Sequence, residues 1–188
     1  FTQGYGVLEA GKTEAVNADT IFAIGSTTKA FTSALIGMLV DEGKLGWEDL
    51  VIQHIPEFEL YDDWVARHVT VRDLLCHRLG LERAQKIYYH RGYDQRELMR
   101  RMKYLKPAVG FRTGFNYANQ QYGVAGLIVE AVTGKSWDDF ITERIFKALN
   151  MSRSFSGHDR ITDNKNFASP HAVLDETYPA GVRFLGEM

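Results

Sequence analysis

The sequence is poor in cysteine and has no long hydrophobic run. Cys76 is the only cysteine among the 188 residues, which excludes an internal disulfide and a metal site built from several cysteines. A membrane-spanning helix needs about 18 or more consecutive apolar residues, and the longest apolar stretch, within residues 30–40, is shorter than that. The sequence therefore predicts no membrane segment in this chain.

An excess of charge of either sign is also missing. The sequence contains 22 lysine and arginine residues against 24 aspartate and glutamate residues, a formal net charge of −2. Such a balance creates no field that would attract nucleic acid or an anionic membrane. The most basic stretch, residues 96–103, fits the solvated side of a helix. We therefore predict no nucleic-acid partner.

Metal ligands and phosphate-binding loops do not occur at the required spacings. The six histidines show no His-x-x-x-His or Glu-x-x-His pattern, which would place two ligands on one helix face. Gly134-Lys135-Ser136 lacks the glycine that a phosphate-binding loop needs five residues earlier, where Val129 stands. We therefore predict no metal and no other cofactor.

The adjacent Cys76 and His77 are the remaining candidates for a nucleophile and its base. Neighbours on a helix point about 100° apart, so the two side chains cannot face one another within the short capped helix that residues 70–77 predict. We expect Cys76 to pack inward as a small buried hydrophobic residue.

The composition is that of a folded domain, with 45% hydrophobic and 24% charged residues. A chain of 188 residues can bury a sizeable core. Residues 1–8 alternate in polarity like a sheet strand, and residues 4–18 read as a strand and turn. Helices are predicted over residues 26–43, 47–56, 70–77, 94–104, 119–133 and 137–149, and a mobile surface segment over 152–166.

The most informative feature is the pair Ser26 and Lys29 before the apolar run 30–40. Residues three apart lie on one helix face, with Cβ atoms roughly 5–6 Å apart, so this hydroxyl and amine can share a proton. Serine is also a common helix cap and lysine is usually solvated. Lys29, however, is the only charge between Asp19 and Asp41, on a helix that we expect to be buried nearly all round. This setting favours nucleophilic chemistry.

A second candidate element is the turn-rich stretch 110–119, which contains Tyr117 and Asn119. A loop between helices presents side chains instead of packing them. A tyrosine there can shuttle a proton, and an asparagine amide can donate to a substrate carbonyl. A lone Tyr-x-Asn means little, and its weight here comes from the pairing with Ser26 and Lys29.

These segments together resemble the serine β-lactamase and penicillin-binding-protein superfamily, most of all its class C β-lactamase, D-alanyl-D-alanine carboxypeptidase and esterase branch. The resemblance follows the family's motif order from about residue 4 to residue 151. It rests on IGSTTKAFT at 24–32, VTVRDLLCHRLGL at 69–81, FNYAN at 115–119 and VTGKS at 132–136.

The resemblance implies a role for each candidate residue. Ser26 would be the acylated nucleophile and its backbone N–H half of the oxyanion hole, and Lys29 would accept its proton. Tyr117 would act as general base and acid, and Asn119 would orient the substrate. The implied fold is α+β, β-lactamase/DD-peptidase-like, and the resemblance suggests a periplasmic or secreted location.

One departure from the family pattern stands out. The third motif, Lys-Thr-Gly or His-x-Gly on a sheet strand lining the site, has no match after Asn119. We therefore expect residues 1–188 to form a single partial domain, truncated at both ends, with mostly the helical lobe and an incomplete antiparallel sheet. The exposed edge of such a sheet can pair with a partner or a second copy of the chain.

Two functions remain open at this stage. The first is a serine hydrolase that acts through an acyl-serine on an ester, a β-lactam or a D-alanyl peptide. The second is a non-catalytic penicillin-binding-like relative, or an inactive fragment, that binds without turnover. Intact Ser26, Lys29 and Tyr117 favour the first, and the missing third motif favours the second.

Overall fold

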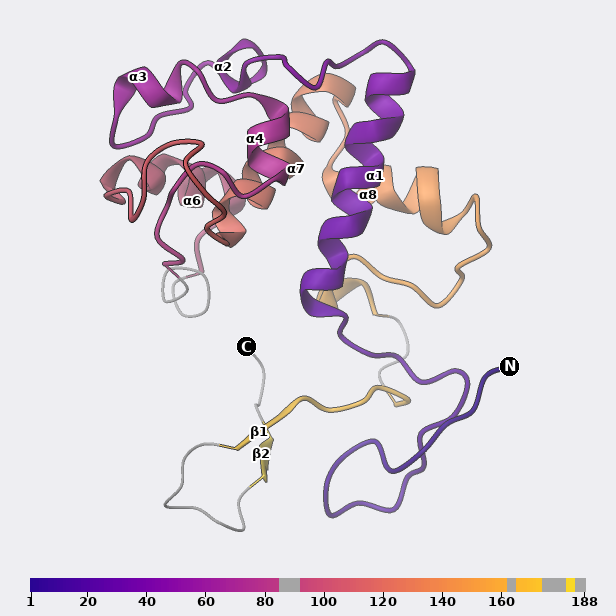
Figure 1. Ribbon diagram of the computed structural model, residues 1–188. Helices are drawn as coiled ribbons and strands as arrows, with labels where there is room; N and C mark the ends of the chain where they lie inside the picture. The colour runs from indigo at the N-terminus through magenta and orange to yellow at the C-terminus, as the bar shows by residue number, and fades with distance from the viewer. Residues whose placement is uncertain (85–91, 162–164, 174–181, 185–188) are drawn as a thin grey trace. The chain divides into compact units, whose positions relative to one another are not determined.

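The computed structural model describes residues 1–84, 92–161, 165–173 and 182–184 (Figure 1). The chain divides into two compact units. The terminal unit combines Phe1–Ser26 with Thr142–Met188, and the helical unit is the continuous stretch Thr27–Ile141.

The helical unit is organised around one long helix, α7 (Asn119–Thr133). Helices α1, α2, α4, α6 and α8 all contact α7, and Figure 1 shows α4 lying against it. The other elements of this unit are α1 (Thr28–Asp41), α2 (Val51–His54), α3 (Asp63–Ala66), α4 (Val71–Leu75), α6 (Gln95–Arg101), the 3₁₀ turn η2 (Met102–Tyr104) and α8 (Trp137–Ile141).

The core of the helical unit forms where apolar faces meet α7. Val124, Ile128 and Val129 of α7 are almost completely buried. Helix α1 contributes one face, which consists of Thr32, Leu35, Ile36 and Leu39 at helical spacing. The expectation that α1 is buried nearly all round is wrong, because residues 30 and 34 on its other side are exposed.

Local sequence signals set several helix ends. Thr70 caps α4, since its hydroxyl accepts the Asp73 N–H while the Asp73 carboxylate accepts the Thr70 N–H. Helix α7 ends at Gly134, whose φ of 69° is the left-handed conformation that glycine adopts at little cost. The predicted helix over residues 137–149 forms as α8 followed by a π-helical turn, η3 (Thr142–Phe146).

The terminal unit contains little regular structure among its described residues. It holds most of the 3₁₀ turn η1 (Gly25–Thr27), a second turn η4 (His158–Arg160), and the strands β1 (His171–Val173) and β2 (Val182–Phe184). The two strands pair antiparallel, with Ala172 opposite Arg183. These two short strands form the only sheet within the described residues, and the predicted incomplete antiparallel sheet stays a prediction.

The predicted strand over residues 1–8 does not form. The segment makes only an isolated antiparallel bridge between Val7 and Ala15, supported by a 2.8 Å hydrogen bond from Leu8 N–H to Glu14 O. Gly6 and Gly11 have φ values of 77° and 83°, which interrupt an extended backbone and turn the chain back on itself.

In the predicted surface segment 152–166, residues 162–164 lie outside the described part of the chain.

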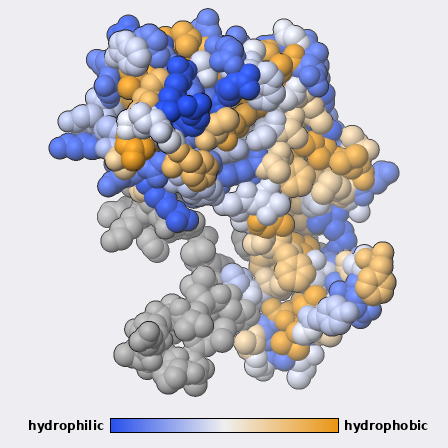
Figure 2. Space-filling view, in the orientation of Figure 1, coloured by the Kyte–Doolittle hydropathy of each residue, from blue (hydrophilic) through white to orange (hydrophobic). Residues whose placement is uncertain are grey.

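Large hydrophobic side chains also reach the surface, where orange and blue residues intermingle in Figure 2. Phe115, in the loop before α7, is 72% exposed, and Trp64 of α3 is 61% exposed. Within the described ranges, no helix combines the length and hydrophobicity required to cross a bilayer.

Candidate active site

Lys29 lies at the centre of a side-chain cluster in the helical unit. It belongs to the first turn of α1, and its Nζ donates a 2.8 Å hydrogen bond to Oδ1 of Asn119 at the start of α7. The same Nζ lies 4.7 Å from the centre of the Tyr117 ring and 5.5 Å from that of Tyr122. The structure therefore brings together Lys29, Tyr117 and Asn119, three of the four predicted site residues.

Ser26 is the last residue of the terminal unit. It is exposed and lies in the turn η1, directly before α1. Its relation to the cluster is given by the chain itself, in which Ser26 precedes Lys29 by three residues.

The loop before α7 presents Tyr117 as predicted, without regular secondary structure from residue 110 to residue 118. Tyr117 is half-buried, and the Arg83 guanidinium lies 5.3 Å from its ring centre. Two cations, Lys29 and Arg83, thus flank the phenol ring. A positive environment of this kind favours chemistry in which negative charge develops.

His77 is a member of the cluster that the sequence did not reveal. The expectation that Cys76 packs inward is wrong, because Cys76 is exposed and His77 is only 6% exposed. The reason is the end of α4 at Leu75: Cys76 is the residue after the helix, and His77 then adopts a left-handed φ of 55°. This turn directs the imidazole into the protein, where no helical periodicity could have predicted it.

The surroundings of His77 decide its charge. Burial lowers the pKa of the imidazole below its ordinary value of 6.5, and the positive charge of Lys29 lowers it further. Both effects favour the neutral imidazole. The rings of Phe115, Tyr117 and Tyr122 lie 5.4, 4.5 and 5.2 Å from the imidazole, centre to centre.

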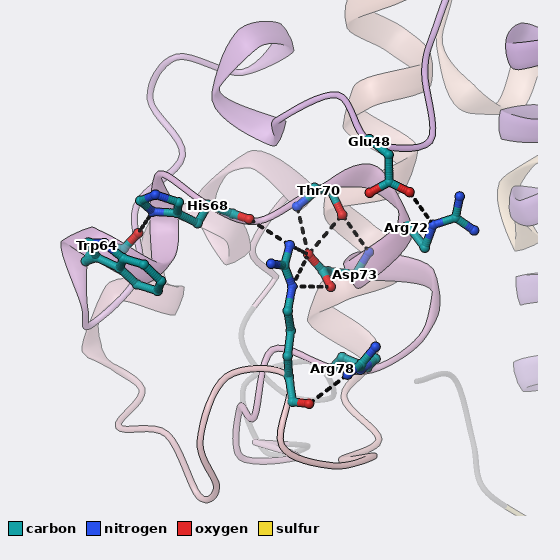
Figure 3. A network of polar contacts seen from close by, with 8 residues as sticks. Glu48, Trp64, His68, Thr70, Arg72, Asp73 and Arg78 are labelled. Carbon is teal, nitrogen blue, oxygen red and sulfur yellow. Dashed lines mark hydrogen bonds and ion pairs between the residues drawn. The ribbon is translucent and has the colours of Figure 1, made fainter.

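A polar network fixes the beginning of the loop (Figure 3). The Arg112 guanidinium grips the Asp73 carboxylate with Nε–O distances of 3.0 and 3.1 Å, and it also donates to the His68 carbonyl at 3.1 Å. The backbone N–H of Arg112 donates to the Arg78 carbonyl at 2.8 Å, and the Arg78 guanidinium donates back to the Arg112 carbonyl at 2.7 Å. The network ties the loop to α4 and to the segment that follows it.

Residues 77–81 and 107–118 approach closely along their length. Asn116 donates from its backbone N–H to the His77 carbonyl and from its amide to the Leu81 carbonyl, both at 2.9 Å. Gly80 has a φ of 74°, and a Cβ at this position would lie 2.1 Å from the Val109 carbonyl oxygen. Only glycine allows this approach.

Other candidate sites are sparse. No group of three or more histidine, cysteine, aspartate or glutamate residues is arranged to hold a metal in the described part of the chain. The terminal unit has an open cavity of about 880 Å³, whose lining includes Phe146, Lys147, Met151, Ser154, Phe155 and Arg160. None of the predicted site residues lines this cavity.

Comparison with known proteins relates this chain to one family. The family model Beta-lactamase matches residues 1–182. An unguisins hydrolase of Aspergillus campestris is 33% identical over 165 residues, which cover 82% of this chain and 30% of that protein. Penicillin-binding protein 4 of Amycolatopsis lactamdurans is 35% identical over 155 residues, covering 80% of this chain and 40% of that protein. This chain thus spans well under half the length of these curated relatives.

A solved structure gives the same assignment at the level of fold. The octameric penicillin-binding protein homologue from Pyrococcus abyssi superimposes with a TM-score of 0.80 at 26% sequence identity, over 98% of this chain and 43% of that one. The elements described above therefore adopt a β-lactamase/DD-peptidase-like fold. On this evidence the chain belongs to the Beta-lactamase family, within the serine β-lactamase and penicillin-binding-protein superfamily.

Proposed function

We propose that this chain carries the nucleophile and the proton-transfer residues of a serine hydrolase. The reaction proceeds through an acyl-serine on an ester, a β-lactam or a D-alanyl peptide, as in the class C β-lactamase, D-alanyl-D-alanine carboxypeptidase and esterase branch. The observation that carries the proposal is the convergence of Lys29, Tyr117 and Asn119, with Lys29 bonded to Asn119 at 2.8 Å and beside the Tyr117 ring.

The hydrogen bond between Lys29 and Asn119 assigns a direction to the Asn119 amide. Its Oδ1 accepts from the lysine, so its NH₂ group is the end left to donate to a substrate carbonyl. Lys29 thereby fixes the orientation of the group that would hold the substrate. This is a positioning effect, and such effects contribute strongly to catalysis because the reacting atoms are held at short range.

The proposed reaction has two halves. The Ser26 oxygen attacks the substrate carbonyl, and its proton passes to the Tyr117 oxygen, whose deprotonated form the Lys29 ammonium stabilises. Tyr117 then gives this proton to the leaving group as the scissile bond breaks. A water molecule then attacks the acyl-serine while Tyr117 takes its proton. The Ser26 oxygen leaves with a proton returned from Tyr117, which restores the starting state. The Ser26 backbone N–H supplies one donor to the oxyanion.

The names of the relatives support a hydrolase, since one is an unguisins hydrolase and another a penicillin-binding protein. The alternative is a protein that is acylated without turnover, or that binds without acylation, and the labelling experiment distinguishes it from a hydrolase.

Active-site labelling tests the proposal. The protein is treated with a fluorophosphonate and, separately, with a penicillin, and the adduct is mapped by mass spectrometry. We expect one adduct on Ser26, its loss in Ser26→Ala, and its retention in the control Ser152→Ala, which removes an exposed serine of the terminal unit. Labelling that survives Ser26→Ala contradicts the assignment. Loss of the penicilloyl adduct with time supports a hydrolase of β-lactams, whereas a permanent adduct combined with no turnover of an ester or a D-alanyl peptide supports the non-catalytic alternative.

A further inference from the structure

His77 contacts almost every residue that leads into α7. Its carbonyl accepts the Asn116 N–H at 2.9 Å, and its Nδ1 accepts the Ala118 N–H at 3.3 Å. The rings of Phe115 and Tyr117, which alternate in sequence with these two bonded residues, also contact the imidazole. One residue thus holds the backbone on both sides of Tyr117: the His77 carbonyl binds Asn116, and the His77 side chain binds Ala118.

We propose that His77, as a neutral imidazole, is the positioning residue that holds Tyr117 and Asn119 against Lys29. The inference rests on the proposed function, because it assigns a role at the same site. His77 acts through the loop, because the Ala118 amide that it binds lies between Tyr117 and Asn119 in the chain. The Tyr117 ring, in turn, contacts both the imidazole and the Lys29 ammonium.

The hydrogen-bond pattern requires a particular tautomer. An Nδ1 atom that accepts the Ala118 N–H carries no hydrogen, so the single ring proton of neutral His77 resides on Nε2. Protonation would place a hydrogen on Nδ1, facing the hydrogen of the Ala118 amide. The bond would then be lost, and the loop would lose its fixed point beside Tyr117.

The groups around His77 oppose such protonation. From α1 the Lys29 ammonium acts on it, from α7 the Tyr122 ring packs against it, and the loop contributes Tyr117. The Tyr122 hydroxyl is engaged elsewhere, since it donates to the Leu75 carbonyl at 2.9 Å. Burial and Lys29 both lower the pKa of His77, so the acid-induced release would occur below pH 6.5.

Two substitutions separate the hydrogen bond from the ring. His77→Asn keeps an acceptor near the Nδ1 position, tolerates the left-handed φ of 55° and does not titrate. His77→Phe keeps the ring volume and removes the acceptor. His68→Asn is the matched control, because His68 is an exposed histidine whose carbonyl bond to Arg112 does not involve its side chain.

The rate of fluorophosphonate labelling at Ser26 is measured from pH 5 to pH 8, with circular dichroism to check folding. We expect His77→Phe to label about ten- to a hundredfold more slowly than wild type at pH 7.5, since small misplacements of catalytic groups have effects of this size. His77→Asn should restore most of the rate, and the ratio of its rate to that of wild type should rise as the pH falls. His68→Asn should follow wild type throughout. A His77→Phe rate equal to that of wild type, or a ratio independent of pH, overturns the proposal.

Nuclear magnetic resonance provides a readout that does not depend on acylation. In wild type at pH 7.5, the ring nitrogen shifts of His77 should report an Nε2–H tautomer, and the Ala118 amide should exchange slowly with solvent. An imidazolium or an Nδ1–H tautomer at that pH overturns the proposal. Failure of the proposed function would be distinct from this, because Ser26 would then remain unlabelled in wild type while the His77 tautomer and the Ala118 amide kept the behaviour described here.

Discussion

The guanidinium of Arg112 holds the buried carboxylate of Asp73 with two of its nitrogens, Nε at 3.0 and 3.1 Å and a terminal nitrogen at 2.5 Å. Only 6% of the Asp73 side chain is exposed, whereas 42% of the Arg112 side chain is. Thr70 supplies two further donors to the same carboxylate, its N–H at 3.0 Å and its hydroxyl at 2.9 Å. Removal of one of these partners leaves the buried charge incompletely compensated, which destabilises the folded state.

Arg112→Ala should therefore destabilise the protein more than a surface pair would suggest. We expect the free energy of unfolding to fall by about 1–3 kcal/mol in Arg112→Ala. The fall should be smaller in Arg112→Lys, which keeps the positive charge but lacks the planar guanidinium that binds the carboxylate through two nitrogens. The control is Arg72→Ala, which breaks a bond to Glu48 between two largely exposed side chains and should cost under about 1 kcal/mol. Urea unfolding measures all three, and equal losses for the two alanine variants would contradict the prediction.

Asp73 should also make the protein sensitive to acid. Burial acts to raise its pKa, but the hydrogen bonds from Arg112 and Thr70 together outweigh burial and hold the pKa below its ordinary value of 3.8. Because the folded state binds this proton less readily than the unfolded state, the stabilisation is complete well above pH 3.8 and is lost as the pH falls through the lower folded pKa.

The measurement compares wild type with Asp73→Asn, whose side chain does not titrate. We expect the difference in free energy of unfolding between them to be constant above about pH 5 and to shrink below pH 3.8. A difference that grows on acidification would show that folding raises the pKa of Asp73 instead of lowering it. Use of the difference removes the contributions of other titrating groups that both proteins share.

Lys29 and Tyr117 should act as one proton-transfer unit. Their contact, with Nζ 4.7 Å from the ring centre, leads us to expect that Lys29→Ala and Tyr117→Phe each slow Ser26 acylation and that the double variant is little slower than the worse single one. The rate of labelling by a chromogenic β-lactam or a fluorophosphonate checks this. Losses that multiply would assign the two residues to separate steps.

Gln121 is a buried amide whose replacement should stabilise the protein. Its side chain is fully buried in α7, and neither amide atom has a hydrogen-bond partner in the described part of the chain. Gln121→Met has a similar volume and should raise the free energy of unfolding by about 1–2 kcal/mol. Gln53→Met serves as the control and should lower it, since Gln53 Oε1 accepts the Leu50 N–H at 2.7 Å. A loss of stability in Gln121→Met would point to a partner such as bound water.

The 188-residue chain by itself should be a poor catalyst. It contains no third motif, so one oxyanion donor and one wall of the substrate cleft are not supplied, and one such donor is worth about 10²–10³ in rate. Turnover of p-nitrophenyl acetate and nitrocefin, with Ser26→Ala as the background, and the mass of the chain in solution test this. Rapid turnover by a monomer would mean that the third motif is dispensable.

Much of the helical unit follows from local sequence. The capping box of Thr70 and Asp73, the end of α7 at Gly134 and the loop that presents Tyr117 could all be predicted, because each depends on residues a few positions apart. The hydrogen bond between Lys29 and Asn119 spans 90 positions. The sequence placed the two residues in one site only through the resemblance, and it did not predict the bond.

The supporting residues could not be predicted. Arg112 meets Asp73 across 39 positions, and Ala118 meets His77 across 41. Both Arg112 and His77 also have positive φ values, which neither residue type signals in a sequence. The alternation of residues 1–8 predicted a strand, but Gly6, with its positive φ, interrupts the extended backbone of this segment. In each case tertiary contacts or backbone turns override the local pattern.

The division of the chain has a consequence for its synthesis. The helical unit, Thr27–Ile141, is uninterrupted, so all of its residues have been translated before Thr142 is added. The terminal unit cannot be completed at that stage, because the Thr20 hydroxyl donates a hydrogen bond to the side chain of Asn166, which lies 146 positions later. Because domains fold as they emerge from the ribosome, we expect the Lys29 cluster to assemble first on the nascent chain. A nascent chain whose emerged part ends between Ile141 and Asn166 would therefore present a folded helical unit together with residues 1–26 still without their partner segment, and those residues are what a chaperone or protease would encounter.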